Sequence, residues 1–466
     1  MADGVEKKQG GIRVKVANRS HVQARKKLGR RECQLVTFDL PYLAFYYNQK
    51  LLIYRCDESY GEMVAKLKDG LSYVLEEFYP LAGKLGKDED GAFKVEYDDE
   101  IDGVEVLEAG VDDCGEVVGV DDLIEKQDMS FLQELVPYNG VLNLEGLHRP
   151  LLAVQLTKLR DGLAIGCAFN HAVLDGTSTW HFMSSWAEIC SGPRATVSVP
   201  PFHDRTKVRN TRVKLNLSVP SQAQQDGTAD ANGTHASNGA PEPMLRERVF
   251  RFSESAIENI KSKLNSQLSD GVKPFSTFQS LSIHIWRAVT TARQLKPEDP
   301  TVFTIFADCR KRVDPPMPDS YFGNLIQAIF TATAAGLLLA NQPEFGAGMI
   351  QKAIEAHDAK AIDKRNDDWE RNPVIFQYKD AGVNCVAVGS SPRFKVYDVD
   401  FGWGKPESVR SGLNNKFDGM VYLYPGKSGG KSIDVEISLE GKAMENLEKD
   451  HDFLMEVEAA ATAQKL

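Results

Sequence analysis

The sequence lacks the features of several large protein classes. Its seven cysteines are odd in number and never spaced as CxxC, so we expect neither a disulfide framework nor a zinc site. No window approaches ~18 uninterrupted apolar residues, and residues 1–9 contain no apolar stretch of the kind found in signal peptides. We therefore expect a cytosolic protein without a transmembrane segment or a bound metal.

An excess of basic residues is also missing. The chain has 55 Lys and Arg residues against 66 Asp and Glu, which gives a net charge of -11 and a pI near 5.5. Nucleic-acid-binding domains usually carry the opposite charge, so no nucleic-acid partner is expected. The short basic stretch at residues 25–31 is interpreted as solvated surface.

The length of 466 residues predicts two or three domains. Residues 218–243 are polar, of low complexity and rich in Gly, Ala, Ser, Asn and Pro, so they cannot bury enough apolar surface to offset the entropy of ordering. We predict an N-terminal domain at residues 1–195, a crossover with a flexible linker at 196–243, and a C-terminal domain at 244–466.

Alternating helices and strands are expected on both sides of this linker. Two apolar runs, residues 151–159 and 163–169, are joined by Asp161-Gly162, a pair typical of hairpins. The second run is almost continuously apolar, which predicts a strand buried on both faces. Apolar residues at helical spacing follow it at 177–190.

The second half gives further specific expectations. We predict a helix with Ser255 as its N-cap and another that begins at Ser276, where Gln279 completes a capping box. Residues 345–362 are predicted to be helical, and residues 394–401 are predicted to form a strand.

The stretch NHAVLDG places His171, Asp175 and Gly176 between the buried strand and the helix. Such a junction suits catalytic groups, because a rigid element on each side fixes a short, accessible turn. A lone HxxxD pattern is weak by itself, and the alternative is a helix start without chemistry. On these residues alone, catalysis and structure stay equally open.

Three other motifs are weaker. The DFGWG stretch at 400–404 is not a kinase motif, since no Gly-rich loop or HRD accompanies it, and by itself it favours a structural turn. The stretch GKSGGKS at 426–432 is not a phosphate loop, because Pro425 stands where glycine is needed and strands flank it; we predict a hairpin turn. Ser178 lacks the second glycine of a hydrolase elbow.

Taken together, these motifs resemble those of the plant BAHD acyl-CoA-dependent acyltransferases, which carry HxxxDG near the middle of the chain and DFGWG near its C-terminal end. The resemblance covers essentially the whole chain outside the linker. Within the family, the sequence most resembles the members that act in plant cuticle formation. Further matching segments are YPLAGKL at 79–85, STFQSLSIHIWR at 276–287, DCR at 308–310 and YFGN at 321–324.

The resemblance implies an α/β fold of two chloramphenicol-acetyltransferase-like domains, with mixed β-sheets and flanking helices. An active-site channel would run along the domain interface, with acyl-CoA entering from one face and the acceptor from the other. A monomer is expected, with acyl-CoA and a small hydroxylated acceptor as its partners and with no permanently bound cofactor.

The resemblance also assigns roles in the reaction. His171 would be the general base, which suits an imidazole titrating near pH 6.5. The indole N–H of Trp403 is the candidate donor to the oxyanion of the tetrahedral intermediate. Asp175 would be a structural brace paired with Arg310, and Gly176 would permit close backbone approach.

The remaining family positions are assigned by analogy. Asp400, Gly402 and Gly404 would be structural members of the DFGWG motif. Coenzyme A would be held by three residues near the start of one predicted helix, namely Ser276, Thr277 and Lys273.

Three functions stay open at this point. The first is an O-acyltransferase that transfers a fatty or hydroxy-fatty acyl group from CoA to an alcohol in cutin formation, without an acyl-enzyme. The second is a hydroxycinnamoyl-CoA-dependent transferase acting on an alcohol or a polyamine. The third is a catalytically silent binding protein of the same fold, which intact His171, Asp175 and Trp403 disfavour.

Overall fold

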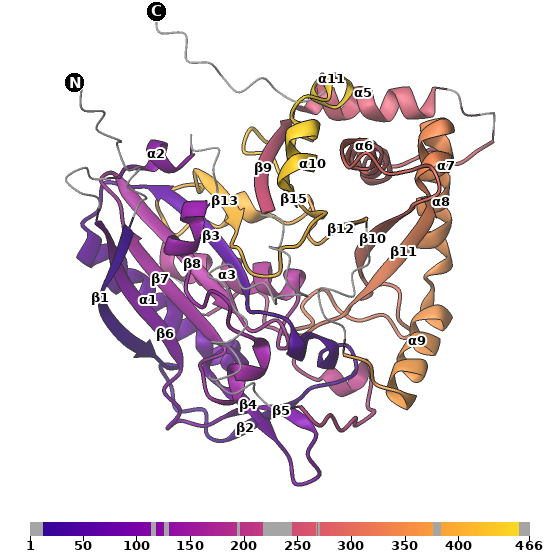
Figure 1. Ribbon diagram of the computed structural model, residues 1–466. Helices are drawn as coiled ribbons and strands as arrows, with labels where there is room; N and C mark the ends of the chain where they lie inside the picture. Colours follow the sequence, from indigo (N-terminus) through magenta and orange to yellow (C-terminus); the bar gives the residue numbers. More distant parts are fainter. Residues whose placement is uncertain are drawn as a thin grey trace, which may run out of the picture.

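A computed structural model shows how the chain folds (Figure 1). It describes residues 13–112, 118–124, 130–192, 196–217, 245–266, 268, 271–375 and 384–455. The linker predicted at 218–243 therefore lies outside the described residues. No helix in the described part of the chain is long and apolar enough to cross a membrane.

The first six-stranded sheet lies in the violet half of Figure 1, except for its orange-yellow edge strand β13. Strands β6 and β7 pair in parallel and the other neighbours pair antiparallel, so the sheet is mixed. Its order is β1 (Arg13–Val22), β6 (Val104–Asp112), β7 (Leu152–Lys158), β8 (Gly162–Phe169), β3 (Asn48–Arg55) and β13 (Ser408–Ser411). Helices α1 (Tyr60–Glu77) and α3 (Gly176–Ser191) pack together beside it.

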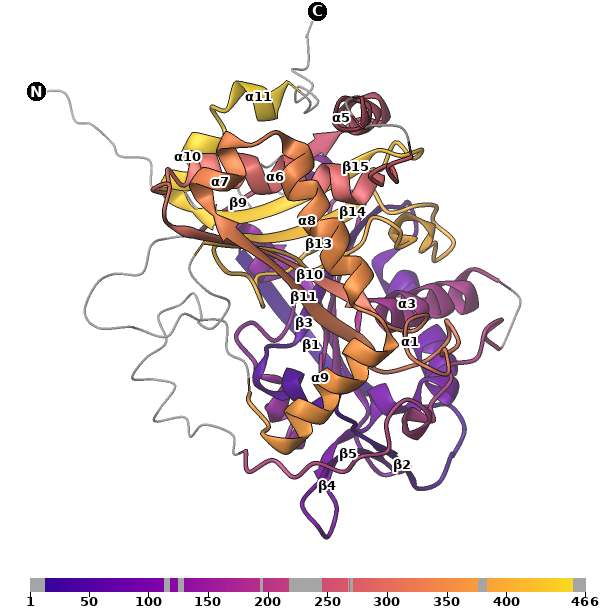
Figure 2. The ribbon, with the colours of Figure 1, turned by 90° about the vertical axis from the view of Figure 1, so that its right-hand side faces the viewer.

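The second six-stranded sheet is also mixed, because β12 pairs in parallel with both β10 and β14. Its order is β11 (Ile326–Ala334), β10 (Pro300–Asp308), β12 (Cys385–Val388), β14 (Met420–Pro425), β15 (Ile433–Glu440) and β9 (Leu245–Phe252). The helices of this part of the chain are α5 (Glu254–Asn265), α6 (Thr277–Ala292), α7 (Ala335–Ala340), α8 (Pro343–Ala356), α9 (Ala359–Arg371), α10 (Gly441–Leu447) and α11 (His451–Leu454). Figure 2 shows α9 below the sheet, apart from the other helices.

Smaller elements complete the described chain. A three-stranded sheet has the order β2 (Arg31–Gln34), β5 (Phe93–Tyr97) and β4 (Lys84–Lys87), and α2 is a short helix (Val120–Ile124). Short 3-10 helices lie at Leu40–Ala44, Tyr79–Ala82, Ser130–Leu135, Asn143–Leu147, Arg205–Lys207 and Val396–Asp398.

Two hairpins confirm the turn chemistry expected from the sequence. Strands β7 and β8 pair antiparallel across the Asp161-Gly162 turn, and every residue of β8 is buried, as its continuous apolar run predicts. The stretch at 426–432 joins β14 to β15, and Gly429 and Gly430 there have φ of 79° and 62°. Positive φ is the conformation that glycine adopts without strain, so this stretch is a turn and not a phosphate loop.

Three predictions about the second half are wrong. The helix expected at 345–362 is two helices, α8 and α9, because Asp358 accepts a bond from the Ala361 amide and starts a new helix. The N-cap of α5 is Ser253, two residues before the predicted Ser255, since its hydroxyl meets the Ala256 amide. Residues 394–401 contain a 3-10 turn and no strand.

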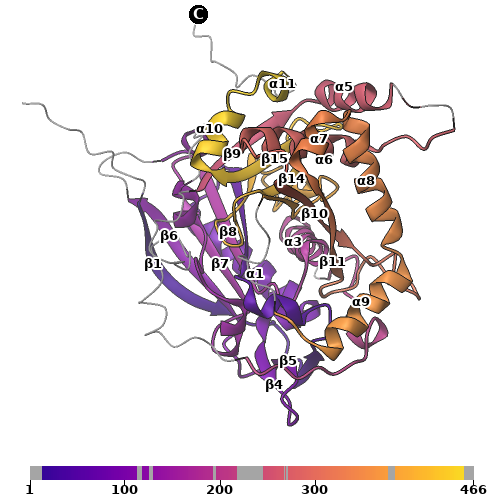
Figure 3. The same ribbon diagram turned by 45° about the vertical axis from the view of Figure 1, so that its right-hand side comes forward.

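The two sheets are joined by more than one segment. Strand β13, which lies late in the chain, pairs with β3 of the first sheet, with Ser411 opposite Lys50. Residues 196–217 also connect the two parts, since Phe202 forms a bridge with Tyr321. Figure 3 shows the two sheets facing a common central region, with α3 between them. The domain boundaries proposed from the sequence stay a prediction, because much of the crossover lies outside the described residues.

Candidate active site

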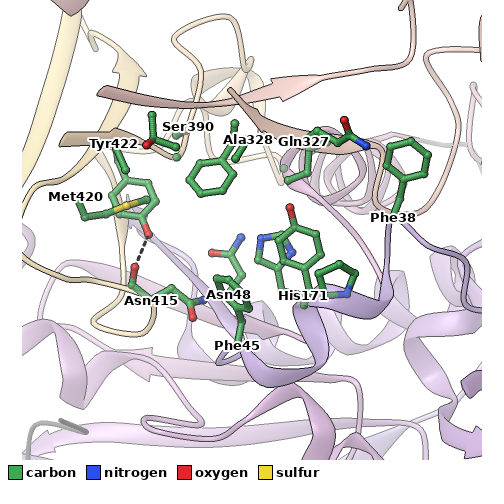
Figure 4. Close-up of a pocket in the computed structure, with 18 of the residues that line it drawn as sticks. Phe38, Phe45, Asn48, His171, Gln327, Ala328, Ser390, Asn415, Met420 and Tyr422 are labelled. Atoms are coloured by element: carbon green, nitrogen blue, oxygen red, sulfur yellow. Dashed lines mark hydrogen bonds between the residues drawn. The ribbon is translucent and has the colours of Figure 1, made fainter. Parts of the chain in front are cut away.

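His171 lies in the short connection between β8 and α3 (Figure 4). Two asparagines from distant parts of the chain hold its backbone. The His171 amide donates to the Asn143 side-chain oxygen at 2.8 Å, and the Asn324 side-chain amide donates to the His171 carbonyl at 2.8 Å. Residues from both parts of the chain therefore fix where the imidazole stands.

The imidazole is prepared to accept a proton. Its Nδ1 lies 3.1 Å from the Leu174 carbonyl, which can only accept, so in the neutral ring Nδ1 carries the hydrogen and Nε2 the lone pair. The Tyr42 ring stacks on the imidazole at 4.6 Å between centroids. Burial lowers the pKa of His171 from its ordinary value, which keeps the ring neutral near pH 7.

Asp175 does not line the cavity beside His171; it caps α3, where it accepts a hydrogen bond from the Ser178 amide at 2.9 Å. Arg310 grips its carboxylate with two hydrogen bonds of 2.8 and 3.0 Å, and the Leu325 amide donates at 3.0 Å. Burial alone would raise the pKa of Asp175, but the Arg310 charge and these bonds outweigh burial and lower it. The carboxylate therefore stays ionised inside the protein.

A second buried ion pair supports the same connection, and the sequence did not reveal it. Asp39 lies 3.0 Å from the Arg205 guanidinium and accepts from the backbone and side-chain amides of Asn324 at 3.0 and 3.2 Å. Arg205 also donates to the Val173 carbonyl at 2.6 Å. Burial raises the pKa of Asp39 despite the Arg205 charge. Neither residue belongs to a recognisable motif, since their pairing depends on a contact across 166 positions of sequence.

A cavity of about 360 Å³, called the interface cavity here, lies between the two parts of the fold. Aromatic and aliphatic side chains predominate in its wall (Figure 4). From the first part come Thr37, Phe38, Pro41, Tyr42, Phe45, Asn48, Lys50, His171, Gly176 and Trp180. From the second come Thr304, Phe306, Ile326, Gln327, Ala328, Phe330, Arg365, Asn366, Trp369, Val374, Cys385, Ala387, Gly389, Ser390, Phe394, Asn415, Phe417, Met420 and Tyr422.

Gly176 lines this cavity for a steric reason. A Cβ atom at this position would stand 2.9 Å from the Phe394 ring, so a larger residue would push Phe394 out of place. His171 and Gly176 are the members of the predicted site that the structure brings together in the cavity wall.

The DFGWG stretch lies elsewhere. Asp400 accepts hydrogen bonds from the amides of Gly402 and Gly404 at 2.7 and 2.8 Å, and both glycines have positive φ. The Trp403 ring lies 5.9 Å from the Tyr54 ring and 5.0 Å from the Lys66 ammonium of α1. None of residues 400–404 lines the interface cavity, so the structure does not bring Trp403 together with His171.

The three residues expected to hold coenzyme A lie at the start of α6. Ser276 caps this helix, accepting from the Gln279 amide at 3.3 Å, and the Lys273 ammonium lies 2.8 Å from the Glu355 carboxylate. Lys273 and Ser276 are exposed, Thr277 is half-buried, and none of the three lines the interface cavity. A helix start at the surface can accept phosphate, since its free amides and dipole favour an anion.

Within the described residues, no group of three or more His, Cys, Asp or Glu side chains could hold a metal ion. The cysteines of that same part of the chain are all free.

Comparison with known proteins identifies the family of this chain. The Transferase family model matches residues 12–454. The BAHD acyltransferase DCR of Arabidopsis thaliana is 62% identical over 461 residues, which cover 96% of this chain and 93% of that protein. The chain belongs to the BAHD acyltransferase family. A more distant member, the hydroxycinnamoyl-CoA:5-hydroxyanthranilate N-hydroxycinnamoyltransferase HHT1 of Avena sativa, is 33% identical over 82% of this chain and 86% of its own.

Solved structures share the BAHD fold. TRI101 of F. graminearum complexed with ethyl coenzyme A matches with a TM-score of 0.73 and 18% identity, covering 92% of this chain and 99% of that one. Vinorine synthase matches with a TM-score of 0.67 and 18% identity, over 96% and 99% of the two chains. The predicted α/β fold of two mixed sheets with flanking helices is confirmed, and the protein is an acyltransferase.

Proposed function

We propose that the protein transfers an acyl group from coenzyme A to an alcohol, with His171 as the general base. The geometry of His171 carries this proposal: Nδ1 is fixed on the Leu174 carbonyl, which leaves Nε2 as the basic nitrogen of a residue that lines the interface cavity. The donor class is supported by TRI101, a protein of the same fold whose structures contain coenzyme A.

The reaction follows from this arrangement. The acceptor hydroxyl gives its proton to His171 Nε2 as its oxygen attacks the thioester carbonyl carbon. The tetrahedral intermediate then expels the CoA sulfur, which takes the proton back from the imidazolium, so the base is regenerated. A thioester is already activated, and a direct transfer of this kind needs no covalent acyl-enzyme.

Cys385 offers the alternative of a covalent acyl-enzyme, because its thiol is in the cavity wall. Burial raises the pKa of this thiol, so the reactive thiolate is scarce at neutral pH. Direct attack assisted by His171 is therefore the simpler pathway.

Two further assignments stay proposals. Asp175 and Arg310 would brace the His171 connection, which their two hydrogen bonds and complete burial support. Donation of the Trp403 indole N–H to the oxyanion has weaker support: Nε1 finds no hydrogen-bond partner among the described residues, yet the residue does not line the interface cavity. Ser276, Thr277 and Lys273 stay candidates for the coenzyme A phosphates at the surface.

For the acyl group we favour a fatty or hydroxy-fatty chain used in cutin formation. The apolar wall of the interface cavity suits such a chain, and the resemblance to cuticle-forming members points the same way. A hydroxycinnamoyl donor is the alternative, supported by HHT1 of Avena sativa, whose name states that donor. A monomeric, cytosolic enzyme stays a prediction.

The experiment is a turnover panel. Purified protein is offered fatty, ω-hydroxy-fatty and hydroxycinnamoyl-CoA with glycerol-like and amine acceptors, and release of the CoA thiol is measured together with product mass. We expect the highest kcat/KM for an aliphatic donor with an alcohol. Preference for a hydroxycinnamoyl donor or an amine would overturn the substrate assignment, and absence of transfer with every pair would favour a silent binding protein.

A further inference from the structure

Lys50 is a buried cation in the wall of the interface cavity. It belongs to β3, its exposed fraction is 3%, and its ammonium lies 3.3 Å from the Tyr424 hydroxyl. The ammonium also stands over the Tyr422 and Tyr424 rings, 5.4 and 5.8 Å from their centroids. A phenol and two ring faces do not neutralise a buried charge, which is normally paired with an anion.

A neighbouring lysine shows what pairing looks like in this fold. The side chain of Lys416 is also buried, and its ammonium lies 2.5 Å from the Glu247 carboxylate and 2.7 Å from that of Glu436. Lys50 has no carboxylate within ion-pair distance among the described residues. The difference is that Lys50 faces the cavity, where a ligand can supply the missing anion.

The register of β3 places this cation relative to His171. Asn48 pairs with Phe169, two residues before His171, whereas Lys50 pairs with Cys167. Side chains two residues apart share one face of a strand, so Asn48 and Lys50 both face the cavity, and Lys50 lies about 7 Å further from the His171 end. Figure 4 shows Tyr422, the neighbour of Lys50, on the side of the cavity away from Phe38.

We propose that Lys50 binds a carboxylate at one end of a substrate whose hydroxyl or thioester reaches His171. The substrate class is then a hydroxy acid as acceptor, or an acyl-CoA with a free carboxylate on its acyl chain. The methylene chain would lie against Phe45, Phe417 and Met420, which line the same cavity. This deepens the proposed function, since the reaction itself still rests on His171.

The charge state of Lys50 supports the assignment. Burial lowers the pKa of Lys50 to about 8, and Glu436 and Lys416 act on it in opposite directions, so the ammonium remains mostly protonated at pH 7. Burial raises the pKa of the facing Tyr422 and Tyr424 hydroxyls and of the Cys167 thiol on β8, and it lowers the pKa of His171. Between pH 7 and 9, Lys50 is therefore the group around this end of the cavity whose charge changes.

A binding experiment tests the site without turnover. Decanoate, which has no hydroxyl to acylate, and its uncharged methyl ester are titrated by calorimetry into the wild-type protein, Lys50→Met and Lys66→Met. Lys66 supplies the matched control, because it carries the same charge but does not line the cavity. We expect decanoate to bind about 10- to 100-fold more tightly than the ester, as for a hydrogen bond between charged groups, and this preference to disappear in Lys50→Met alone.

If decanoate binds Lys50→Met as tightly as wild type, the proposal is overturned. The wild-type protein gives a second measurement should Lys50→Met fail to fold: the preference for decanoate should fall as pH rises through about 8, and a constant preference up to pH 9.5 would also overturn the proposal. His171→Ala should bind decanoate normally, because His171 is not part of the proposed carboxylate site. Wild-type protein that binds decanoate but transfers nothing in the turnover panel would contradict the proposed function and leave the carboxylate site standing.

Turnover then identifies which substrate carries the carboxylate. One arm compares 10-hydroxydecanoate with its methyl ester as acceptor, and the other compares a dicarboxylic monoacyl-CoA with the plain acyl-CoA as donor. Lys50→Met should abolish the kcat/KM preference for the charged substrate in one arm only. Equal losses for charged and uncharged substrates in both arms would show that Lys50 serves coenzyme A or packing, against the proposal.

Discussion

The connection at 170–175 and the DFGWG turn at 400–404 look alike in sequence: both are short and contain an aspartate, and glycine follows the first and lies within the second. Their environments differ. The first lines the interface cavity through His171, whereas the second contributes no residue to the cavity wall and packs Trp403 against Tyr54 and α1.

The two stretches also obtain their hydrogen bonds differently. The His171 connection is held from outside, by Asn143, Asn324 and Arg310, which come from three separate parts of the chain. The DFGWG turn is closed from within, since Asp400 binds the amides of Gly402 and Gly404. Distant supports fix the position of a reacting group to a fraction of an ångström, whereas a self-contained turn mainly fixes the path of the chain.

Replacing His171 should have the largest effect on activity. In His171→Ala the neutral base is lost, so we expect kcat/KM to fall about 10²- to 10⁴-fold. The melting temperature should change little, because the Asn143 and Asn324 contacts are made to the His171 backbone. Turnover and thermal unfolding are compared with those of His148→Ala, a histidine on the surface. Full activity in His171→Ala would remove the general base from the mechanism.

Replacing Asp175 should have the largest effect on stability. Asp175→Asn leaves the Arg310 charge buried without its partner, which typically costs about 3–5 kcal/mol of unfolding free energy. Activity should fall with it, since the His171 connection loses its brace. Asp308→Asn is the matched control, because Asp308 meets the same arginine at 3.2 Å with a half-exposed side chain, where an ion pair is worth about 0–1 kcal/mol. A fully stable but inactive Asp175→Asn would instead indicate direct participation in the reaction.

Replacing Trp403 tests whether the DFGWG turn is structural or takes part in the reaction. If the DFGWG turn is structural, Trp403→Phe keeps the ring against Tyr54 and lowers kcat by less than about tenfold. If the indole N–H serves the oxyanion, the same change should lower kcat by about 10²- to 10³-fold while the melting temperature stays nearly constant. Steady-state kinetics on the purified variant decide between these outcomes.

Local patterns in the sequence predicted the helix and strands around His171, whereas the fold class and the role proposed for His171 came from the family resemblance. The buried run of β8, its Asp161-Gly162 turn and the helix start at Asp175 can be read within 30 residues. The pairing of Asp175 with Arg310 needed the family resemblance, since nothing local connects them.

Other parts of the site could not be predicted for the same physical reason. Asp39 and Arg205 are far apart in the sequence and come together only in the folded protein. Nothing in the sequence around Lys50 indicates that its side chain lines a cavity. The expected strand at 394–401 was wrong because its apolar residues, among them Val396 and Phe401, are buried in a loop that contacts both sheets: the 3-10 turn at Val396–Asp398 contacts β14, and the Tyr54 hydroxyl of β3 donates to the Val399 carbonyl.

The smallest effect expected is a shift in the pH profile. His171 must be neutral to accept a proton, and burial lowers its pKa, so kcat/KM should rise with pH through a midpoint below 6.5 and stay level at neutral pH. Stability should also rise with pH, because between the lowered pKa of folded His171 and its ordinary value the unfolded chain binds the proton more readily than the folded one. Burial also lowers the pKa of His203 and of His357 to about 4, so these two residues contribute to the same rise in stability. Activity is therefore the more specific measure.

The profile of Trp403→Phe sharpens this measurement. Since Trp403 lies outside the cavity wall, its replacement should leave the acid midpoint of kcat/KM where the wild type has it. Asp175→Asn should move the midpoint downward, because the carboxylate charge raises the pKa of His171 and the substitution removes that charge. An acid midpoint above 6.5 in the wild type would show that a nearby anion of the free protein outweighs burial. A midpoint that moves in Trp403→Phe would place the indole within electrostatic reach of the base.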